Sequence, residues 1–425
     1  MRILITGTTG ESMPPPYGGV PKLSLLCAGV WRSQGHQVGL TFTYRPTNAD
    51  DLGAKAEYFF EYSSRPTKIK KAIFLLRYFL LNPSLYRKLL SSYRKIHPRS
   101  SREALLYAAY GVFIDGVLSR FKPDIVLCEA ALIKTFMVAH VAKRRDVPVV
   151  IDSYAEIHDL SMGVNKNLNE GERQKYWSGF LKLADLVIAP GPYCCRGPLT
   201  YLPKEKVEFV YDGSDYSVAK LGITEDKMTL RGMMKLPKDL FLIGNIGAFE
   251  TRKGHDHLIK AVGKLVKAGH PIGAVICGGS GDPAKWKALA KEEGVENNLF
   301  LTGRLSELDL GRVIKSLDAF SDLENTPRAC GLTMAILEGM AMGLPVIVYD
   351  NRELFEVVKE GENGLSVPIN DIDKLAETIL TMYRLSPDVR EAMGVRAAKE
   401  ARRIDINFTA SGKIKLFEQV LHSRK

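Results

Sequence analysis

Cysteine is scarce in this sequence and poorly spaced for metal or disulfide chemistry. The chain of 425 residues has six cysteines, and none of them forms a C-x-x-C pair. Cys194 and Cys195 are adjacent, a spacing unsuited to a tetrahedral metal site. These features argue against a disulfide scaffold and predict reduced thiols in a cytoplasmic protein.

Long apolar runs are also lacking. The longest such stretch, residues 72–81, is interrupted by Arg77 and is far shorter than the about 20 residues needed to span a bilayer. Residues 1–7 predict a short strand that leads into a glycine-containing turn rather than a secretory signal. We therefore expect a cytoplasmic protein without a membrane-spanning segment.

Acidic residues are absent from one segment. Residues 65–102 contain eleven Lys or Arg and no Asp or Glu, so this segment carries the whole net charge of +11. Leu85, Leu89, Tyr93 and Ile96 share one helical face, with basic residues largely elsewhere. This composition is typical of a helix on an anionic membrane surface. The alternative is an insertion whose apolar face packs on the first domain. Nucleic-acid binding is not expected, because no recognised module accompanies the charge.

The length and the apolar pattern indicate two α/β domains. Strand-like runs alternate with helical stretches, the pattern of parallel sheets covered by helices. We expect strands at residues 3–6, 38–42, 125–128, 147–151, 186–189 and 207–210, and then at 241–246, 272–277, 299–302, 319–323 and 345–348. Residues 213–238 have weak periodicity, so the domains are expected to join there.

Two glycine-containing turns each lie between a strand and a helix. The first ends at Gly18 and Gly19, where the backbone can approach a ligand closely and the following helix offers free amides to an anion. The turn lacks the G-x-G-x-x-G pattern of dinucleotide sites. The second places Arg252 and Lys253 at the start of a helix, where cations oppose the helix dipole unless an anion lies between them. A pyrophosphate would resolve this conflict, although two solvated cations are the simpler interpretation.

The run from Thr326 to Val348 is the most informative. Gly331, Leu332 and Thr333 are predicted to begin an almost wholly apolar helix that ends at the sequence Gly343-Leu344-Pro345. Glu338 lies in the middle of this helix, and a buried carboxylate needs hydrogen-bond donors. The ribose hydroxyls of a nucleotide would supply them; a buried salt bridge within the protein is the alternative.

These motifs, taken in order, give the chain a resemblance to a known family. The sequence contains G-G-V at Gly18, K-G at Lys253, G-G-S-G at residue 278, L-T-G-R at residue 301 and L-E-G-M-A-M-G-L-P-V-I at residue 337. It also contains Q-G-H-Q-V, K-P-D-I-V, A-D-L-V-I-A and V-Y-D-G-S-D at residues 34, 122, 184 and 210. In this order they resemble the retaining GT-B glycosyltransferases related to glycogen synthases and bacterial mannosyl- and glucosyltransferases.

The resemblance implies a fold of two Rossmann-like domains whose parallel sheets face each other across a cleft. We expect an acceptor-side domain at residues 1–215, a nucleotide-sugar domain at residues 216–402, and a final helix at residues 403–425 that packs back on the first domain. The family's roles imply that Lys253 binds the donor diphosphate, with Arg252 sharing the role, and that Glu338 binds the ribose. Gly18 and Gly19 would approach the donor phosphates, as would Gly331, Leu332 and Thr333 at the helix start.

The sequence departs from the family pattern at three places. Ala248 stands where the family often has Arg, and Cys330 stands where its E-x7-E pattern has the first glutamate. A histidine of the family would fall near Tyr154, whereas the nearest histidine is His158. Glu324 is the nearest alternative to the missing glutamate. These departures raise the alternative of a GT-B subunit that binds without turnover.

The expected chemistry is transfer of a hexose with retention, from a nucleotide-diphosphate sugar to a saccharide or lipid-linked acceptor, in glycan or cell-envelope synthesis. No cofactor or metal is expected; Asp371 and Asp373 form a D-x-D, but they precede a helix at 375–382 that Asp371 would cap. The protein would be cytoplasmic, at the inner face of a membrane. A rival prediction is an NAD-dependent short-chain dehydrogenase, because Tyr216 and Lys220 match Y-x-x-x-K.

Overall fold

The computed structural model describes residues 1–7, 19–45, 56–97, 103–154, 157, 165, 167–279, 281–325, 331–350 and 354–424. The chain divides into two compact units. The first comprises Met1–Asp212 together with Ile406–Lys425, and the second comprises Gly213–Asp405. These junctions lie three residues from the expected ones.

The first unit is built on a parallel sheet. Within its described residues seven strands pair in the order β3-β2-β1-β4-β5-β6-β7. They are β1 (Arg2–Thr6), β2 (Gln37–Tyr44), β3 (Glu57–Tyr62), β4 (Ile125–Glu129), β5 (Val149–Asp152), β6 (Leu186–Ala189) and β7 (Val207–Phe209). Six of these strands match the expected runs, whereas β3 was not predicted. β3 is an edge strand that contains Glu57 and Glu61. It therefore lacks the continuous apolar run of a buried parallel strand.

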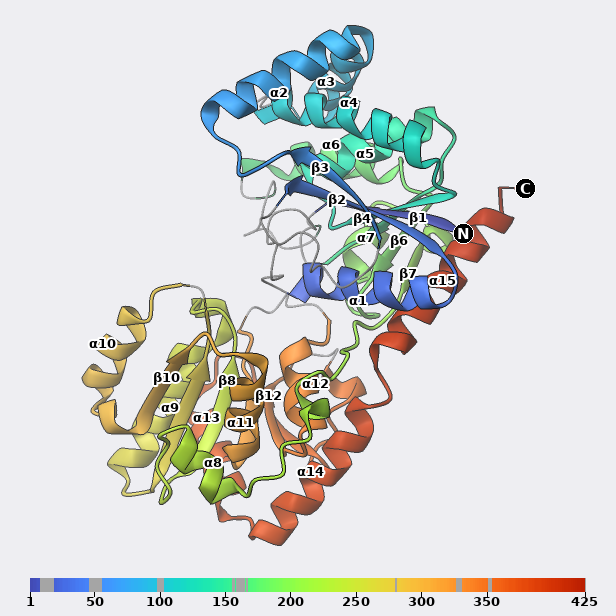
Figure 1. The fold of residues 1–425 in the computed structure, drawn as a ribbon. Coiled ribbons are helices and arrows are strands. Elements are labelled where there is room, and N and C mark those ends of the chain that lie inside the picture. The colour runs from blue at the N-terminus through green and yellow to red at the C-terminus, as the bar shows by residue number, and fades with distance from the viewer. Residues whose placement is uncertain are drawn as a thin grey trace. The chain divides into compact units, whose positions relative to one another are not determined.

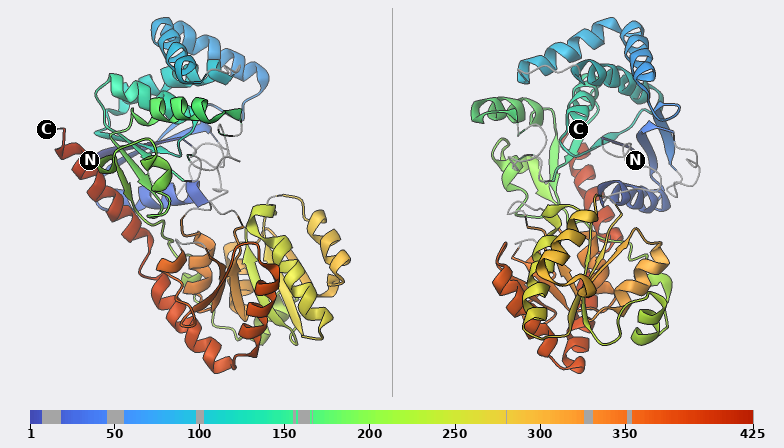
Figure 2. Two further views of the ribbon diagram at one scale, coloured as in Figure 1. Left: turned by 180° about the vertical axis from the view of Figure 1, so that it is seen from behind. Right: turned by 90° about the vertical axis from the view of Figure 1, so that its left-hand side faces the viewer.

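Helices cover this sheet. They are α1 (Gly19–Ser33), α2 (Lys68–Leu81), α3 (Pro83–Ile96), α4 (Glu103–Phe121), α5 (Ile133–Arg144), α6 (Glu170–Leu181) and α7 (Arg196–Leu199). α2 and α3 form an outer layer that packs on α4 (Figures 1 and 2). The last helix, α15 (Ile406–His422), packs beside α1, and the Trp31 indole donates to the carbonyl of Ala410 at 2.9 Å.

The structure corrects the prediction for the basic segment in part. Leu85, Leu89 and Tyr93, expected on a membrane-facing surface, are buried, so α3 packs its apolar face on the first unit. Glycines on two neighbouring helices make room for it. A Cβ at Gly111 of α4 would lie 2.5 Å from the Leu89 side chain, and one at Gly179 of α6 would lie 2.4 Å from Ile96.

The second unit has its own parallel sheet. Its described residues contain six strands in the order β10-β9-β8-β11-β12-β13. They are β8 (Phe241–Ile246), β9 (Ile272–Cys277), β10 (Leu299–Gly303), β11 (Ala319–Asp322), β12 (Val346–Tyr349) and β13 (Gly364–Val367). Five match the expected runs. β13 was missed because it is a four-residue edge strand that begins with glycine.

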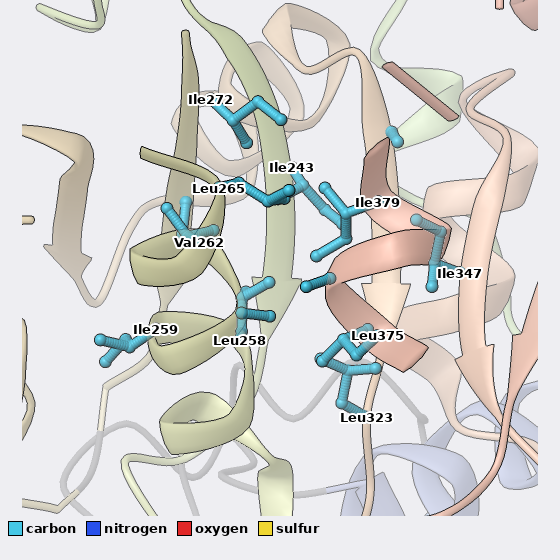
Figure 3. Close-up of a cluster of buried hydrophobic side chains, with 14 of the residues drawn as sticks. Ile243, Leu258, Ile259, Val262, Leu265, Ile272, Leu323, Ile347, Leu375 and Ile379 are labelled. Carbon is cyan, nitrogen blue, oxygen red and sulfur yellow. The ribbon is translucent and has the colours of Figure 1, made fainter. Parts of the chain in front are cut away.

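The helices of this unit are α8 (Lys227–Met233), α9 (His255–Lys267), α10 (Ala284–Glu293), α11 (Glu307–Ser316), α12 (Met334–Ala341), α13 (Ile372–Arg384) and α14 (Pro387–Ala401). Its core fills the layer between α9, α13 and the sheet. Figure 3 shows Leu258 and Leu265 of α9 beside Ile243 of β8, with Leu375 and Ile379 of α13 opposite.

One helix among the described residues is long and apolar enough to cross a membrane, judged by length and composition alone. It is Ala104–Phe121 within α4, a stretch that was not predicted as a candidate span. In the structure 61% of this window is buried, and α4 packs against α2, α3 and α5. The same composition therefore suits the core helix of the first unit.

Candidate functional site

The candidate site lies at the carboxyl edge of the second unit's sheet, beside β8 and β11. These two neighbouring strands form the point where the strand order reverses, because β9 and β10 extend the sheet on one side and β12 and β13 on the other. In open parallel sheets ligands bind outside the carboxyl ends of the strands at such a point. Lys253 follows β8 in the turn η6 (Thr251–Lys253), and Glu324 follows β11.

Glu324 lies between the two predicted phosphate-binding cations. Its Oε2 accepts from Lys253 Nζ at 2.7 Å and its Oε1 accepts from Arg252 Nη1 at 2.7 Å. Arg252 Nε also donates to Glu250 at 2.7 Å. Burial alone would raise the pKa of the Glu324 carboxyl, but the ion pairs with Lys253 and Arg252 outweigh it and hold that pKa below its ordinary value. The anion expected between these cations is thus a protein carboxylate in this structure.

Two loops are joined so that these side chains meet. Gly254 has φ +67°, and a Cβ there would lie 2.1 Å from the carbonyl oxygen of Leu323. The Asn325 amide donates to the Arg252 carbonyl at 2.9 Å, and its side chain donates to the Thr251 carbonyl at 2.9 Å. A side chain at position 254 would therefore push the loop after β11 away from the cations.

The loop after β8 is held from its other side. His255 is fully buried, and burial lowers the pKa of its imidazole. Its Nε2 lies 2.9 Å from the carbonyl oxygen of Ala248. A Cβ at Gly278, after β9, would lie 2.2 Å from the Gly247 carbonyl. Glycine is required there because the loops after two neighbouring strands pack backbone against backbone.

Helix α12 begins later than predicted. Its first residue is Met334, and Thr333 is its N-cap, whose hydroxyl accepts from the Ile336 amide at 3.2 Å. Gly331, with φ +82°, and the buried Leu332 precede the helix. Thr333 also donates to the carboxylate of Asp322, the last residue of β11. Burial raises the pKa of Asp322, and nearby Lys253 opposes that shift, so the cap and the cation lie in one electrostatic environment.

Glu338 is buried as predicted, and the protein supplies one of its donors. The Ser214 hydroxyl donates to Glu338 Oε1 at 2.5 Å, and both residues are almost inaccessible to solvent. This partner is a neutral hydroxyl of the protein and not the cation of a salt bridge, and the prediction that Glu338 binds ribose stays a prediction. Sequence reasoning missed Ser214 even though it lies in the V-Y-D-G-S-D motif. Its distance of 124 positions from Glu338 left no local signal.

Other predicted residues have different outcomes. Gly18, His158 and Cys330 lie outside the described residues. Gly19 is the first residue of α1 and is exposed. Asp371 caps α13 by accepting from the Lys374 amide at 2.8 Å, as predicted.

The dehydrogenase prediction is not supported. The Tyr216 hydroxyl is buried and donates to the backbone carbonyls of Ala401 and Ile404. Lys220 meets Tyr216 through its backbone amide, which donates to the Tyr216 carbonyl at 3.0 Å. Tyr216 therefore joins two ends of the second unit.

A buried charged cluster in the first unit was not predicted. Lys413 of α15 forms an ion pair with Asp152 at the end of β5, and its Nζ lies 3.9 Å from Asp212 Oδ1. Burial raises the pKa of the Asp212 carboxyl to about 7; Lys413 lowers it and Asp152 raises it further. The available signal was a lysine at a core position of an amphipathic helix, four residues before Phe417.

Residues 226–400 match the family model described as glycosyl transferases group 1. This segment is a glycosyl transferases group 1 domain. It lies wholly within the second unit and contains Lys253, Glu324 and Glu338.

Curated relatives of the chain include a named mannosyltransferase. The chain is 25% identical over 215 residues to a phosphatidyl-myo-inositol mannosyltransferase of Mycobacterium leprae, which covers 50% of this chain and 55% of that protein. The chain thus spans about half the length of the curated relatives that it matches.

Solved structures show the fold of the whole chain. A glycosyltransferase from Rickettsia africae superposes with a TM-score of 0.73 at 14% identity, covering 99% of this chain and 98% of that chain. HepE of Anabaena, solved in complex with UDP and glucose, superposes with a TM-score of 0.71 at 17% identity, covering 99% and 100%. Together with the two parallel sheets, these likenesses show that the chain has the GT-B fold.

Proposed function

We propose that the protein transfers a hexose from a nucleotide-diphosphate sugar to a saccharide or lipid-linked acceptor, with retention at the anomeric carbon. The reaction would serve glycan or cell-envelope synthesis on the cytoplasmic side of a membrane. The observation that carries the proposal is the pairing of Lys253 and Arg252 with a single partly buried carboxylate, that of Glu324, at the reversal point of the sheet. A phosphate can replace a carboxylate as the partner of such cations, because both are oxyanions that accept charge-assisted hydrogen bonds.

The donor would be held by three features of the group 1 domain. Lys253 and Arg252 would bind the diphosphate, and the free amides at the start of α12 would face its oxygens. Glu338 would accept from the ribose hydroxyls. Glu338 is five residues beyond the Thr333 cap, about 7.5 Å along the helix axis at 1.5 Å per residue. That separation lets phosphate and ribose contact the same helix.

Lys253 and Arg252 would also stabilise the transition state of the transfer. As the bond between the sugar and the diphosphate breaks, negative charge grows on the leaving oxygens, and fixed cations lower the energy of that state more than that of the bound donor. The proposal requires no metal ion and no further cofactor. Activity that persists after chelation with EDTA would agree with this requirement, and activity restored by added Mg²⁺ or Mn²⁺ would contradict it.

The comparisons agree with a donor of this class. The mycobacterial relative is a mannosyltransferase by name, and the HepE structure contains UDP and glucose. These are properties of those proteins, and they suggest which ligands to test first. A panel of candidate ligands for a binding assay should include UDP-glucose, GDP-mannose, UDP-N-acetylglucosamine and NAD.

Thermal shift with this panel tests the proposal. A true donor raises Tm in proportion to the logarithm of its concentration over its dissociation constant. Lys253→Ala should abolish the shift, whereas Lys267→Ala should keep it, since Lys267 is an exposed lysine in the last turn of α9, at the far end of the helix that follows η6. A shift by NAD alone, or an unchanged shift in Lys253→Ala, would refute the assignment.

A further inference from the structure

Helix α2 exposes an apolar stripe to solvent. Ile69, Ile73, Leu76 and Leu80 are 56–73% exposed. Their spacing of four, three and four residues places them on one side of a helix with 3.6 residues per turn. This stripe is distinct from the face of α3 that was predicted to meet a membrane and that is buried instead.

Helix α2, which carries this stripe, is anchored to the first unit by its opposite side. Thr67 caps its start and accepts from the Lys70 amide, and the side of α2 opposite the stripe is packed through aromatic rings. The Phe74 ring lies 4.8 Å from that of Tyr62 on β3 and 4.6 Å from that of Tyr78. The stripe is therefore the free side of a helix whose other side is fixed to the first unit.

Basic side chains flank the stripe. Lys68 lies on one side of it and Arg77 on the other, and both are exposed. Further exposed cations follow on α2 and α3: Lys71, Arg87, Lys88, Arg94 and Lys95. The sequence from 65 to 102 contains no acidic residue to neutralise them.

These two properties together identify the partner. An exposed row of large aliphatic side chains marks an interaction surface. A second copy of the same face would bring two sets of unbalanced cations together, which like-charge repulsion opposes. An anionic lipid surface satisfies both properties, because aliphatic side chains enter the acyl boundary while lysine and arginine meet the headgroup phosphates.

We propose that α2 lies in the plane of an anionic bilayer surface, with Ile69, Ile73, Leu76 and Leu80 inserted and with Lys68 and Arg77 at the headgroups. The inference stands apart from the proposed transferase reaction, since it concerns where the protein binds and not what it catalyses. A transferase acting on a lipid-linked acceptor would gain from it by meeting the acceptor at the surface.

Vesicle flotation tests this assignment. The full chain should float with phosphatidylcholine vesicles that contain phosphatidylglycerol and stay at the bottom with phosphatidylcholine alone. Replacing Ile73 and Leu80 with Asp should lower the partition coefficient by about tenfold or more, because two inserted side chains become charged. Replacing Lys68 and Arg77 with Gln should weaken binding in a salt-dependent manner.

The matched control is Val395→Asp, which changes an equally exposed aliphatic side chain on α14 of the second unit. It should float like the unchanged protein. Equal flotation of the Ile73 and Leu80 variant, with an unchanged Tm, would overturn the proposal. A vesicle-free dimer that dissociates in that variant would overturn it as well, by showing that the stripe joins two copies. Donor binding by thermal shift should be the same in every variant, so failure here is distinct from failure of the proposed reaction.

Discussion

The ammonium of Lys253 donates to the carboxylate of Glu324 across 2.7 Å, and the guanidinium of Arg252 donates to the other oxygen of the same carboxylate at an equal distance. One anion therefore holds two cations that the proposed donor needs. Donor binding must exchange this carboxylate for a diphosphate or share the cations with it. We therefore expect Glu324 to compete with any anion that binds these two cations.

Glu324→Gln should raise the affinity for inorganic pyrophosphate, because the amide no longer competes as an anion. Isothermal titration should detect a gain of about fivefold to tenfold, the range expected when the partly exposed ion pairs of Glu324 with Lys253 and Arg252 are removed. If Glu324 also positions the sugar, turnover should fall while pyrophosphate affinity rises. Weaker pyrophosphate binding in this variant would show that the carboxylate holds the cations in place rather than competing with the ligand.

The same substitution should change the acid stability. The pKa of Glu324 is below its ordinary value in the folded protein, so its contribution to stability is present above the pKa of the unfolded chain and is lost as pH falls through the folded pKa. The unchanged protein should lose more stability than Glu324→Gln on acidification from about pH 6 to pH 3. Urea unfolding at a series of pH values would measure the difference.

Gly254→Ala should destabilise the second unit and weaken donor binding. The new Cβ meets the Leu323 carbonyl at 2.1 Å, and the residue keeps φ +67°. Gly269→Ala is the matched control, because Gly269 has φ +84° but no atom within 4 Å of the added Cβ. Backbone strain alone should cost the control about 1–2 kcal/mol. A larger loss in Gly254→Ala, measured by urea unfolding, would isolate the collision, and equal losses would contradict it.

Ser214→Ala should act through Glu338. Removing the hydroxyl takes away a donor at 2.5 Å from a buried carboxylate, which costs about 1–3 kcal/mol. In the double variant Ser214→Ala with Glu338→Gln the two losses should not add, since both remove one interaction. Donor affinity should also fall in Glu338→Gln, provided that this variant folds normally. Additive losses of stability would show that the two side chains act separately.

Asp212→Asn should flatten the pH dependence of the first unit. Burial raises the pKa of Asp212 to about 7. The folded state therefore binds more protons than the unfolded chain between about pH 4 and pH 7. Its contribution to stability is present below that window and is lost as pH rises through it. The Tm of the unchanged protein should fall more than that of Asp212→Asn between pH 5 and pH 8, and parallel Tm curves would refute the assigned pKa.

The central strands could be predicted from the sequence because strands buried on both faces are continuous apolar runs. β8 and β9 match their expected bounds residue by residue. The edge strands β3 and β13 could not, because an edge strand needs only part of that apolar character. Glu338 was identifiable because a carboxylate in an apolar helix is conspicuous, yet its partner Ser214 depends on the tertiary fold.

The basic segment shows the limit of periodicity more sharply. Both α2 and α3 carry aliphatic residues at helical spacing, and the pattern by itself does not tell which stripe is covered. The decision depends on small residues of other helices, such as Gly111 and Gly179, which give room for Leu89 and Ile96 of α3. The stripe of α2 has no such cover among the described residues, so it stays exposed.

The second unit begins and ends at neighbouring points of the backbone. Ser214 and Asp405 form a parallel β-bridge, and the chain returns to the first unit directly afterwards. A segment whose ends meet in this way can be exchanged as a single block without lengthening either connection. Replacing residues 213–405 with the corresponding block of a relative would therefore exchange the whole second unit and leave the first unit unaltered.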